Sequence, residues 1–274
     1  MKLSSLLRGV ETQDVYEERE VERVTDKDSE NLNKALFVCV NGNRCDGHTL
    51  ARKAVENGAI AVVTDRDIGL EQQIVVKDTR AAFARIAANF YGNPEKKIKV
   101  IGITGTNGKT STCHIIKGVL DYLGHSCGLI GTVKNVMGTV ESESVLTTPE
   151  PMELYSMLSS MAESGCEYCV MEVSSQALDQ KRVDALRFCA AAVTNITPEH
   201  LDYHLSMENY TDAKLKIQHL SDYICYNSDD AVLSSSKDKI VCKNYTYSTV
   251  SDRADFTAKN IVCNENGIRY EFVG

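Results

Sequence analysis

The sequence lacks several features that would assign its 274 residues to common classes. No apolar run is long enough to span a bilayer, which excludes a transmembrane helix. No tract concentrates positive charge and the net charge is −8, so we do not expect non-specific nucleic-acid binding to be the main role. No internal repeat or low-complexity segment is visible. We therefore expect a globular chain that binds neither membrane nor nucleic acid.

The ten cysteines are scattered through apolar segments, and no signal peptide is recognisable. We therefore expect reduced, buried thiols in a cytoplasmic protein. Cys166 and Cys169 form a single C-x-x-C pair. A zinc or redox site would need a second pair or a helix start, and neither is visible, so an ordinary strand entry is the favoured interpretation.

The stretch over 99–111, KVIGITGTNGKTS, is typical of a phosphate-binding loop. An apolar strand runs into a glycine turn, and an apolar helical pattern follows. Glycines let the backbone approach phosphate oxygens, and N–H groups at the helix start point at the anion. Lys109 would neutralise the β- and γ-phosphates, and the Thr110 hydroxyl would reach a bound Mg²⁺. The spacing departs from the generic motif, because Ile103 stands where that motif has its first glycine. The alternative is a glycine turn between a strand and a helix with an accidental lysine.

Strands and helices alternate through residue 91, which predicts a small α/β domain. A run of glycine, proline and charge over 92–97 marks a boundary. We predict a first domain over 1–97 and a second, P-loop α/β domain with a mainly parallel sheet over 98–274. In the second domain we predict helices over 151–164 and 207–220, strands over 129–133, 168–173, 190–195, 223–226, 231–233 and 239–241, and a hairpin over 256–273.

Polar side chains follow two strands of the second domain. Glu172 ends an apolar strand, where ligands of open α/β sheets collect, so it is placed for Mg²⁺. The alternative is a strand-end glutamate satisfied by neighbours. Pro198 sits where a helix would begin, and His200 and His204, four apart, would share a helical face. We favour a functional role for His200 over a purely structural pair.

Lys214 and Lys216 lie on the helix after these histidines. Composition does not distinguish between them, and two solvated lysines are the simpler interpretation without further information.

Taken together, these motifs resemble the Mur ligase family. The matching segments occur in family order and cover the chain: 102–110, 131–133, 147–150, 171–175, 182–183, 194–195, 200–204 and 213–214. The resemblance implies a UDP-sugar domain followed by an ATPase domain. A third, Rossmann-like domain of the family is expected to be absent from this sequence, which would leave the chain inactive or weak on its own.

The activity implied is ATP-dependent amide formation. The family member most similar in its motifs adds the third amino acid, diaminopimelate or lysine, to UDP-MurNAc-L-Ala-D-Glu through an acyl phosphate in peptidoglycan synthesis. The implied partners are that UDP-MurNAc-dipeptide, ATP and the amino acid, with Mg²⁺ as cofactor and a monomer as the expected state.

The resemblance also assigns residues. Lys109, Glu172, His200 and Lys214 would be catalytic. The ATP phosphates would be bound by Gly105, Thr106, Asn107, Gly108, Lys109, Thr110 and Ser111. Metal ligands would be Thr110, Glu172, His200 and Lys214, the last as a CO₂-derived carbamate. The UDP-MurNAc-dipeptide would be bound by Asn43, Arg44, Thr147, Thr148, Ser174 and Arg182.

Two alternatives remain. One is a non-catalytic paralogue that binds a UDP-sugar or nucleotide. The other is a sister amide ligase such as a folylpolyglutamate or cyanophycin synthetase, although the first domain and the Thr147-Thr148-Pro149 segment fit the muramoyl enzymes better.

Overall fold

The computed structural model describes residues 1–274 except 13, 43, 44 and 266. The chain divides into two compact units. The first comprises 1–97 with 149–163 and 180–185, and the second comprises 98–148, 164–179 and 186–274. The helix over 151–163, which we expected in the second domain, belongs to the first unit, where it packs on the helix over 79–90.

The first unit is built on a four-stranded parallel sheet in the order β1-β2-β3-β4. Its strands are β1 (Arg23–Thr25), β2 (Ala35–Val38), β3 (Ala61–Thr64) and β4 (Gln73–Val75). Its helices are α1 (Leu3–Leu6), α2 (Ala51–Glu56), α3 (Thr79–Phe90) and α5 (Pro151–Glu163), with 3₁₀ turns at Gly47–Leu50 and Pro94–Lys96. The Asp78 carboxylate caps α3 by accepting from the amides of Arg80 and Ala81.

The second unit contains a ten-stranded sheet in the order β14-β13-β12-β11-β10-β5-β9-β6-β7-β8. Strands from β13 to β6 are parallel, whereas β14, β7 and β8 pair antiparallel. These strands are β5 (Lys99–Thr104), β6 (Cys127–Ile130), β7 (Lys134–Met137), β8 (Val140–Glu143), β9 (Tyr168–Glu172), β10 (Phe188–Val193), β11 (Ile224–Asn227), β12 (Asn244–Ser248), β13 (Phe256–Asn264) and β14 (Gly267–Val273). The predicted fold class is confirmed.

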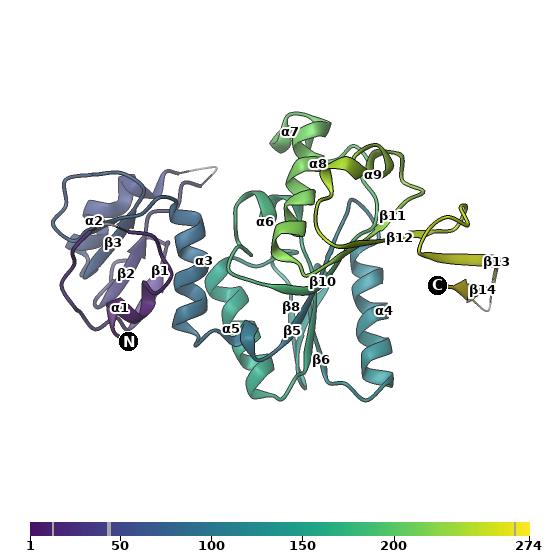
Figure 1. Cartoon of the computed structure of the whole chain (residues 1–274). Helices are drawn as coiled ribbons and strands as arrows, with labels where there is room; N and C mark the ends of the chain where they lie inside the picture. The colour runs from purple at the N-terminus through teal and green to yellow at the C-terminus, as the bar shows by residue number, and fades with distance from the viewer. Residues whose placement is uncertain (13, 43–44, 266) are drawn as a thin grey trace. The chain divides into compact units, whose positions relative to one another are not determined.

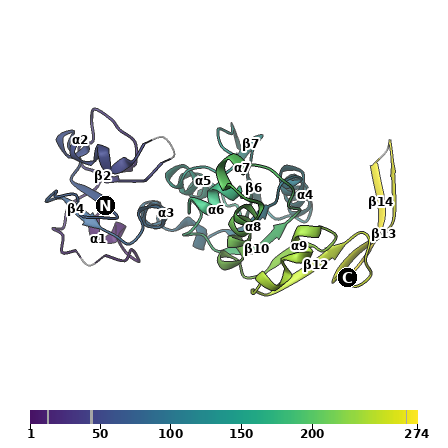
Figure 2. The ribbon, with the colours of Figure 1, turned by 90° about the horizontal axis from the view of Figure 1, so that it is seen from above.

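Helices cover both faces of this sheet, with α4 on one face and α6 and α8 on the other (Figures 1 and 2). The helices are α4 (Lys109–Tyr122), α6 (Ser175–Asp179), α7 (Leu201–His204), α8 (Met207–Leu215) and α9 (Ala231–Ser235), with 3₁₀ turns at Lys216–Leu220 and Lys237–Lys239. A core of buried Ile103, Cys113, Leu129 and Val170 lies between α4 and the central strands. This core fixes the start of α4 against the end of β5.

Several local predictions are wrong. Residues 231–233 form a helix, because Asp230 caps it by accepting from the Leu233 amide. A 3₁₀ turn ending at Lys239 replaces the strand predicted over 239–241, and the next strand is β12. The helix predicted after the glycine turn is confirmed as α4, although Ile115 and Val119 of its apolar pattern are exposed.

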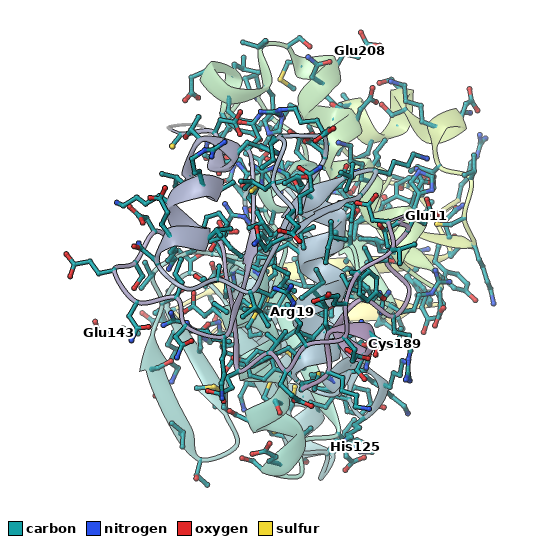
Figure 3. All side chains as sticks on the ribbon, turned by 90° about the vertical axis from the view of Figure 1, so that its left-hand side faces the viewer. Glu11, Arg19, His125, Glu143, Cys189 and Glu208 are labelled. Atoms are coloured by element: carbon teal, nitrogen blue, oxygen red, sulfur yellow. The ribbon has the colours of Figure 1, made fainter. Side chains whose placement is uncertain are left out.

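The surface of the second unit carries acidic side chains that reach into solvent, such as Glu143 and Glu208 (Figure 3). At its edge, β14 is exposed along its whole length, and it presents Ile268, Tyr270 and Phe272. All ten cysteines are free; Cys45 and Cys263 are exposed, contrary to the expectation that the thiols are buried.

Candidate functional site

The glycine turn between β5 and α4 is shaped by contacts with the end of β10. Gly105 has φ +141°, and a Cβ added there would lie 1.9 Å from Thr194 Oγ1. Thr194 Oγ1 donates to the Asn107 carbonyl (2.6 Å), and Asn195 Oδ1 accepts from the Asn107 amide (2.9 Å). The adjacent parallel strands β5 and β10 therefore hold the turn from both sides.

The start of α4 leaves backbone donors available. Gly108 precedes the helix at φ +84°, a conformation that glycine adopts without strain. Among the described residues, no acceptor is found for the amides of Lys109, Thr110 and Ser111. The Thr106 and Asn107 amides, by contrast, donate to Asn195. A helix start with three free N–H groups is an anion-binding element.

Lys109 folds back over the turn. Its Nζ donates to the carbonyl oxygens of Gly105 (2.9 Å) and Thr106 (2.7 Å). Burial lowers the pKa of Lys109, while the carboxylates of Glu172 and Glu199 oppose this change. Among the described residues, the ammonium therefore donates only to backbone oxygens, and an anionic ligand would compete for it.

Glu172 ends β9 with only 1% of its surface exposed. Thr110 Oγ1 donates to both carboxylate oxygens at 3.0 Å. The Thr132 amide donates to Oε1 (2.8 Å), and the Thr132 hydroxyl donates to Oε2 (3.1 Å). Gly131 permits this approach, because a Cβ there would lie 2.5 Å from Oε1.

The donor set around Glu172 fits a hard divalent cation. These four hydrogen bonds to the carboxylate come from neutral donors, and no ion pair to Glu172 is found among the described residues. Carboxylate and hydroxyl oxygens beside a phosphate-binding turn are the ligands that Mg²⁺ prefers. Within the described residues, no three His, Cys, Asp or Glu side chains gather as a metal cluster.

Lys214 is buried at 2% exposure on α8. Its Nζ donates to the Gly105 carbonyl (2.8 Å) and lies 4.6 Å from the ring centre of Tyr210. Burial, together with the nearby charge of Lys109, lowers the pKa of Lys214 to about 7. Lys216, in contrast, is half-exposed and pairs with Asp179 at 2.7 Å. The interpretation of two solvated lysines is therefore wrong for Lys214.

The two histidines do not share a helical face, so that prediction is wrong. His200 precedes α7 with φ +53° and a side chain that is 47% exposed, 3.8 Å from Glu199. His204 is buried, and its Nε2 lies 3.0 Å from Ser175 Oγ. Among the described residues, neither His200 nor Lys214 has a hydrogen bond or ion pair to Glu172.

The residues expected at the UDP-sugar end fall into three groups. In the second unit, Thr148 Oγ1 donates to the Glu172 carbonyl (2.9 Å) and accepts from the Ser174 amide (3.0 Å), while the Thr147 hydroxyl lies 3.0 Å from that of Thr132. In the first unit, Arg182 forms an ion pair with Glu150 (2.9 Å). Asn43 and Arg44 lie outside the described residues.

Thr132, Thr194 and Asn195 also belong to the site, although no role was predicted for them from the sequence. Thr194 and Asn195 directly follow a strand, as Glu172 does at the end of β9. Strand-end position was therefore the signal that could have identified them.

A parallel sheet whose central strand leads through a glycine turn and a lysine into a helix with free amides defines a mononucleotide-binding α/β domain of the P-loop class. The Mur ligase middle domain matches residues 103–274, and the Mur ligase family catalytic domain matches residues 31–91. The chain belongs to the Mur ligase family.

Two relatives illustrate the similarity. The UDP-N-acetylmuramoyl-L-alanyl-D-glutamate–2,6-diaminopimelate ligase of Clostridium perfringens is 36% identical over 280 residues, which cover 99% of this chain and 58% of the relative. The ligase of the same name from Caldanaerobacter subterraneus subsp. tengcongensis is 40% identical over 246 residues, which cover 87% and 50%. The chain thus spans little more than half the length of these curated relatives.

Solved structures agree on the fold. A UDP-N-acetylmuramoyl-L-alanyl-D-glutamate–2,6-diaminopimelate ligase superposes with a TM-score of 0.74 at 23% identity, covering 88% of this chain and 51% of that one. MurF ligase from Thermotoga maritima in complex with ADP gives 0.56 at 22% identity, covering 91% and 55%. No helix in the described part of the chain combines the length and the hydropathy needed to cross a membrane.

Proposed function

We propose that this chain binds ATP and a UDP-MurNAc-dipeptide and that its two domains serve an amide-forming ligase. The ligase adds diaminopimelate or lysine to UDP-MurNAc-L-Ala-D-Glu. The observation that carries the proposal is the pairing of Thr110 with buried Glu172 directly beside the turn that holds Lys109. The relatives' names support the choice of substrate.

In the proposed reaction, the D-glutamate γ-carboxylate attacks the γ-phosphate of ATP, and ADP leaves. The amine of the incoming amino acid then attacks the acyl phosphate, and phosphate leaves. Two anions must approach each other in the first step, so positive charge at the turn lowers the barrier. Lys109 and the free amides of α4 are suited to this, and Thr147, Thr148, Ser174 and Arg182, with Asn43 and Arg44, would bind the UDP-sugar peptide.

Thr110 and Glu172 would hold Mg²⁺, which would supply further neutralisation of the phosphate charge. His200 and a carbamylated Lys214 complete the proposed ligand set, on the strength of the family resemblance. The Lys214 environment suits carbamate formation, because a pKa of about 7 leaves much of the amine neutral at neutral pH. The amine nitrogen would attack the carbon of CO₂, form the N–C bond and release its proton to solvent.

Binding measurements test the proposal. We expect the purified chain to bind Mg²⁺-ATP and UDP-MurNAc-L-Ala-D-Glu in calorimetry, with little or no ligated product by mass spectrometry. Lys109→Met and Glu172→Gln should each weaken Mg²⁺-ATP binding at least tenfold, whereas Glu143→Gln, an exposed carboxylate on β8, should not.

Three outcomes would count against parts of the proposal. Failure to bind either ligand in Mg²⁺ would overturn it. Binding of a UDP-sugar without ATP would favour the non-catalytic paralogue. Full turnover by this chain alone would contradict the expectation that a third domain is needed.

A further inference from the structure

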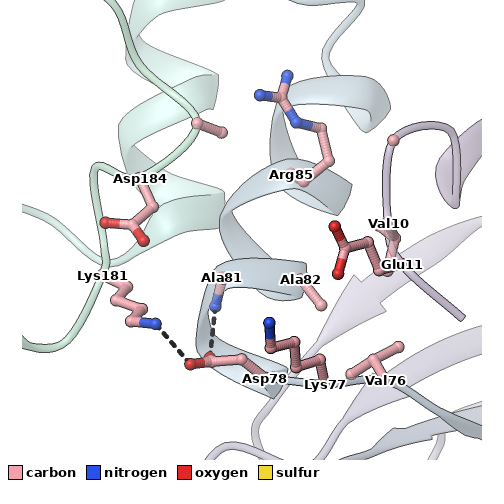
Figure 4. A pocket seen from close by; sticks show the side chains of 12 residues that line it. Val10, Glu11, Val76, Lys77, Asp78, Ala81, Ala82, Arg85, Lys181 and Asp184 are labelled. Atoms are coloured by element: carbon pink, nitrogen blue, oxygen red, sulfur yellow. Dashed lines mark hydrogen bonds and ion pairs between the residues drawn. The ribbon is translucent and has the colours of Figure 1, made fainter. Parts of the chain in front are cut away.

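A cavity of about 430 Å³ lies in the first unit (Figure 4). Its walls come from the segment after α1, the residues between β4 and α3, α3 itself, and the segment over 181–185. Val10, Val76, Ala81 and Ala82 give it apolar walls. The volume is within the range of small-molecule sites, which combine apolar walls with a few polar groups.

Some of the charged groups around this cavity are already engaged. Asp78 accepts from two amides of α3 and forms an ion pair with Lys181 at 2.6 Å. Asp184 also lines the cavity and has an interaction partner of its own. The Asp78–Lys181 pair therefore contributes no net charge to the cavity. The Asp78 carboxylate is also occupied as the acceptor for backbone amides at the start of α3.

Three further charged side chains line the cavity and are not engaged in these interactions. Within the described part of the chain, Glu11, Lys77 and Arg85 have no side-chain hydrogen bond and no ion pair within 4.0 Å. In Figure 4, Glu11 and Lys77 lie on one side of α3, and Lys181 and Asp184 lie on the other. The cavity thus offers two uncommitted cations and one uncommitted anion.

Arg85 lines the cavity from α3. It projects from α3, whose opposite face is buried in the core of the first unit. Glu95 attracts Arg85 without forming an ion pair with it. A guanidinium whose donors are all available binds a carboxylate in a bidentate manner, and such charge-assisted bonds are stronger than neutral ones.

We infer that this cavity binds an acidic α-amino acid. The ligand's two carboxylates match Lys77 and Arg85, its ammonium matches Glu11, and its methylene groups contact the apolar walls. A simple anion would leave Glu11 unpaired beside it, and a monocarboxylic amino acid would leave one cation unpaired. The site shares no residue with the phosphate-binding turn, so the inference does not depend on the proposed ATP chemistry.

Titration calorimetry with ligands that differ by one charged group tests the inference. We expect L- or D-glutamate, or aspartate, to bind the intact chain. Glutamine lacks one carboxylate, and glutarate lacks the ammonium. Each should bind at least tenfold more weakly than glutamate, because a charge-assisted hydrogen bond is lost. Inorganic phosphate that binds as tightly as the amino acids would overturn the inference, as would no binding of any acidic amino acid.

Variants locate the site. Lys77→Met, Arg85→Gln and Glu11→Gln should each weaken amino-acid binding about tenfold or more, while the thermal midpoint shows that the chain remains folded. Arg52→Gln is the matched control, because Arg52 is exposed on α2 and does not line the cavity. Binding that survives Arg85→Gln but is lost in Arg182→Gln would assign the amino acid to the proposed UDP-sugar peptide site and overturn the inference.

Discussion

The ammonium groups of Lys109 and Lys214 donate to one acceptor, the carbonyl oxygen of Gly105, at 2.9 and 2.8 Å. Two like charges that share an acceptor in a buried place repel each other. This repulsion adds to burial in lowering the pKa of Lys214 to about 7. Carbamylation of Lys214 would replace the repulsion by attraction to Lys109, so the arrangement supports the proposed modification.

The pKa of Lys214 predicts how stability depends on pH. Between about pH 7 and the ordinary lysine value of 10.5, the unfolded chain keeps a proton that the folded chain loses. The unfolded state then binds more protons, so the free energy of unfolding should rise with pH, by up to about 1.4 kcal/mol per pH unit. Denaturant unfolding between pH 6 and 9 measures this slope.

Matched lysine variants isolate the contribution of Lys214 to that slope. Lys214→Met should flatten the rise, whereas Lys216→Met, which removes a half-exposed lysine, should leave it unchanged. Lys109→Met should move the onset of the rise in unfolding free energy to higher pH. The charge of Lys109 lowers the pKa of Lys214, so removing it raises that pKa. An identical slope in Lys214→Met and the parent chain would contradict the assignment.

Carbamylation predicts a spectroscopic signal. In ¹³C-bicarbonate buffer at neutral pH, the chain should show a carbamate carbon resonance that disappears in Lys214→Arg. An arginine cannot be deprotonated under these conditions, so it does not react. Lys216→Arg should keep the signal. Its persistence in Lys214→Arg would place the modification elsewhere.

The two glycines of the turn should differ in their response to alanine. Gly105→Ala brings a methyl group against Thr194 Oγ1 at φ +141° and should cost more than about 3 kcal/mol of unfolding free energy. Gly108→Ala at φ +84° meets no atom within 4 Å and should cost only about 1–2 kcal/mol. Denaturant midpoints compare the two, and adding Thr194→Ala should recover part of the Gly105→Ala loss. Equal losses of unfolding free energy in the two variants would show that the close contact with Thr194 does not restrict the residue at position 105.

Alanine substitutions of His204 and His200 should have different effects on the stability of the chain. His204→Ala removes a buried ring that bonds to Ser175 and packs on Tyr203 and Tyr210, so it should destabilise the chain by about 1–3 kcal/mol. His200→Ala removes an exposed side chain and should change stability by less than about 0.5 kcal/mol. Thermal unfolding distinguishes them; a larger loss in His200→Ala would contradict the structural role assigned to His204.

The strand, turn and helix around Lys109 were predicted well from the sequence, because the apolar run of the strand and the glycines of the turn lie within a few residues of each other. The helix over 231–235 was predicted as a strand because a short apolar run is ambiguous, and the capping role of Asp230 was not recognised. The prediction that His200 and His204 share a helical face was wrong, because His200 precedes the helix and adopts a positive φ.

Long-range contacts could not be predicted from the sequence. Thr132 bonds to Glu172 across 40 residues and Asn195 bonds to Asn107 across 88. Which strand ends lie side by side depends on strand order, and β5 is flanked by β9 and β10. Burial of Lys214 likewise depends on how α8 packs. Lys214 and Lys216 are the same residue type, so residue type alone could not predict that one is buried and the other exposed.

The outer strand of the larger sheet has a practical consequence for handling the protein. An unpaired, apolar edge such as Gly267–Val273 is a template onto which another extended segment can add. Light scattering of concentrated samples should therefore grow with time. A charged substitution such as Tyr270→Lys should slow that growth without lowering the melting temperature, because the side chain is more than half exposed.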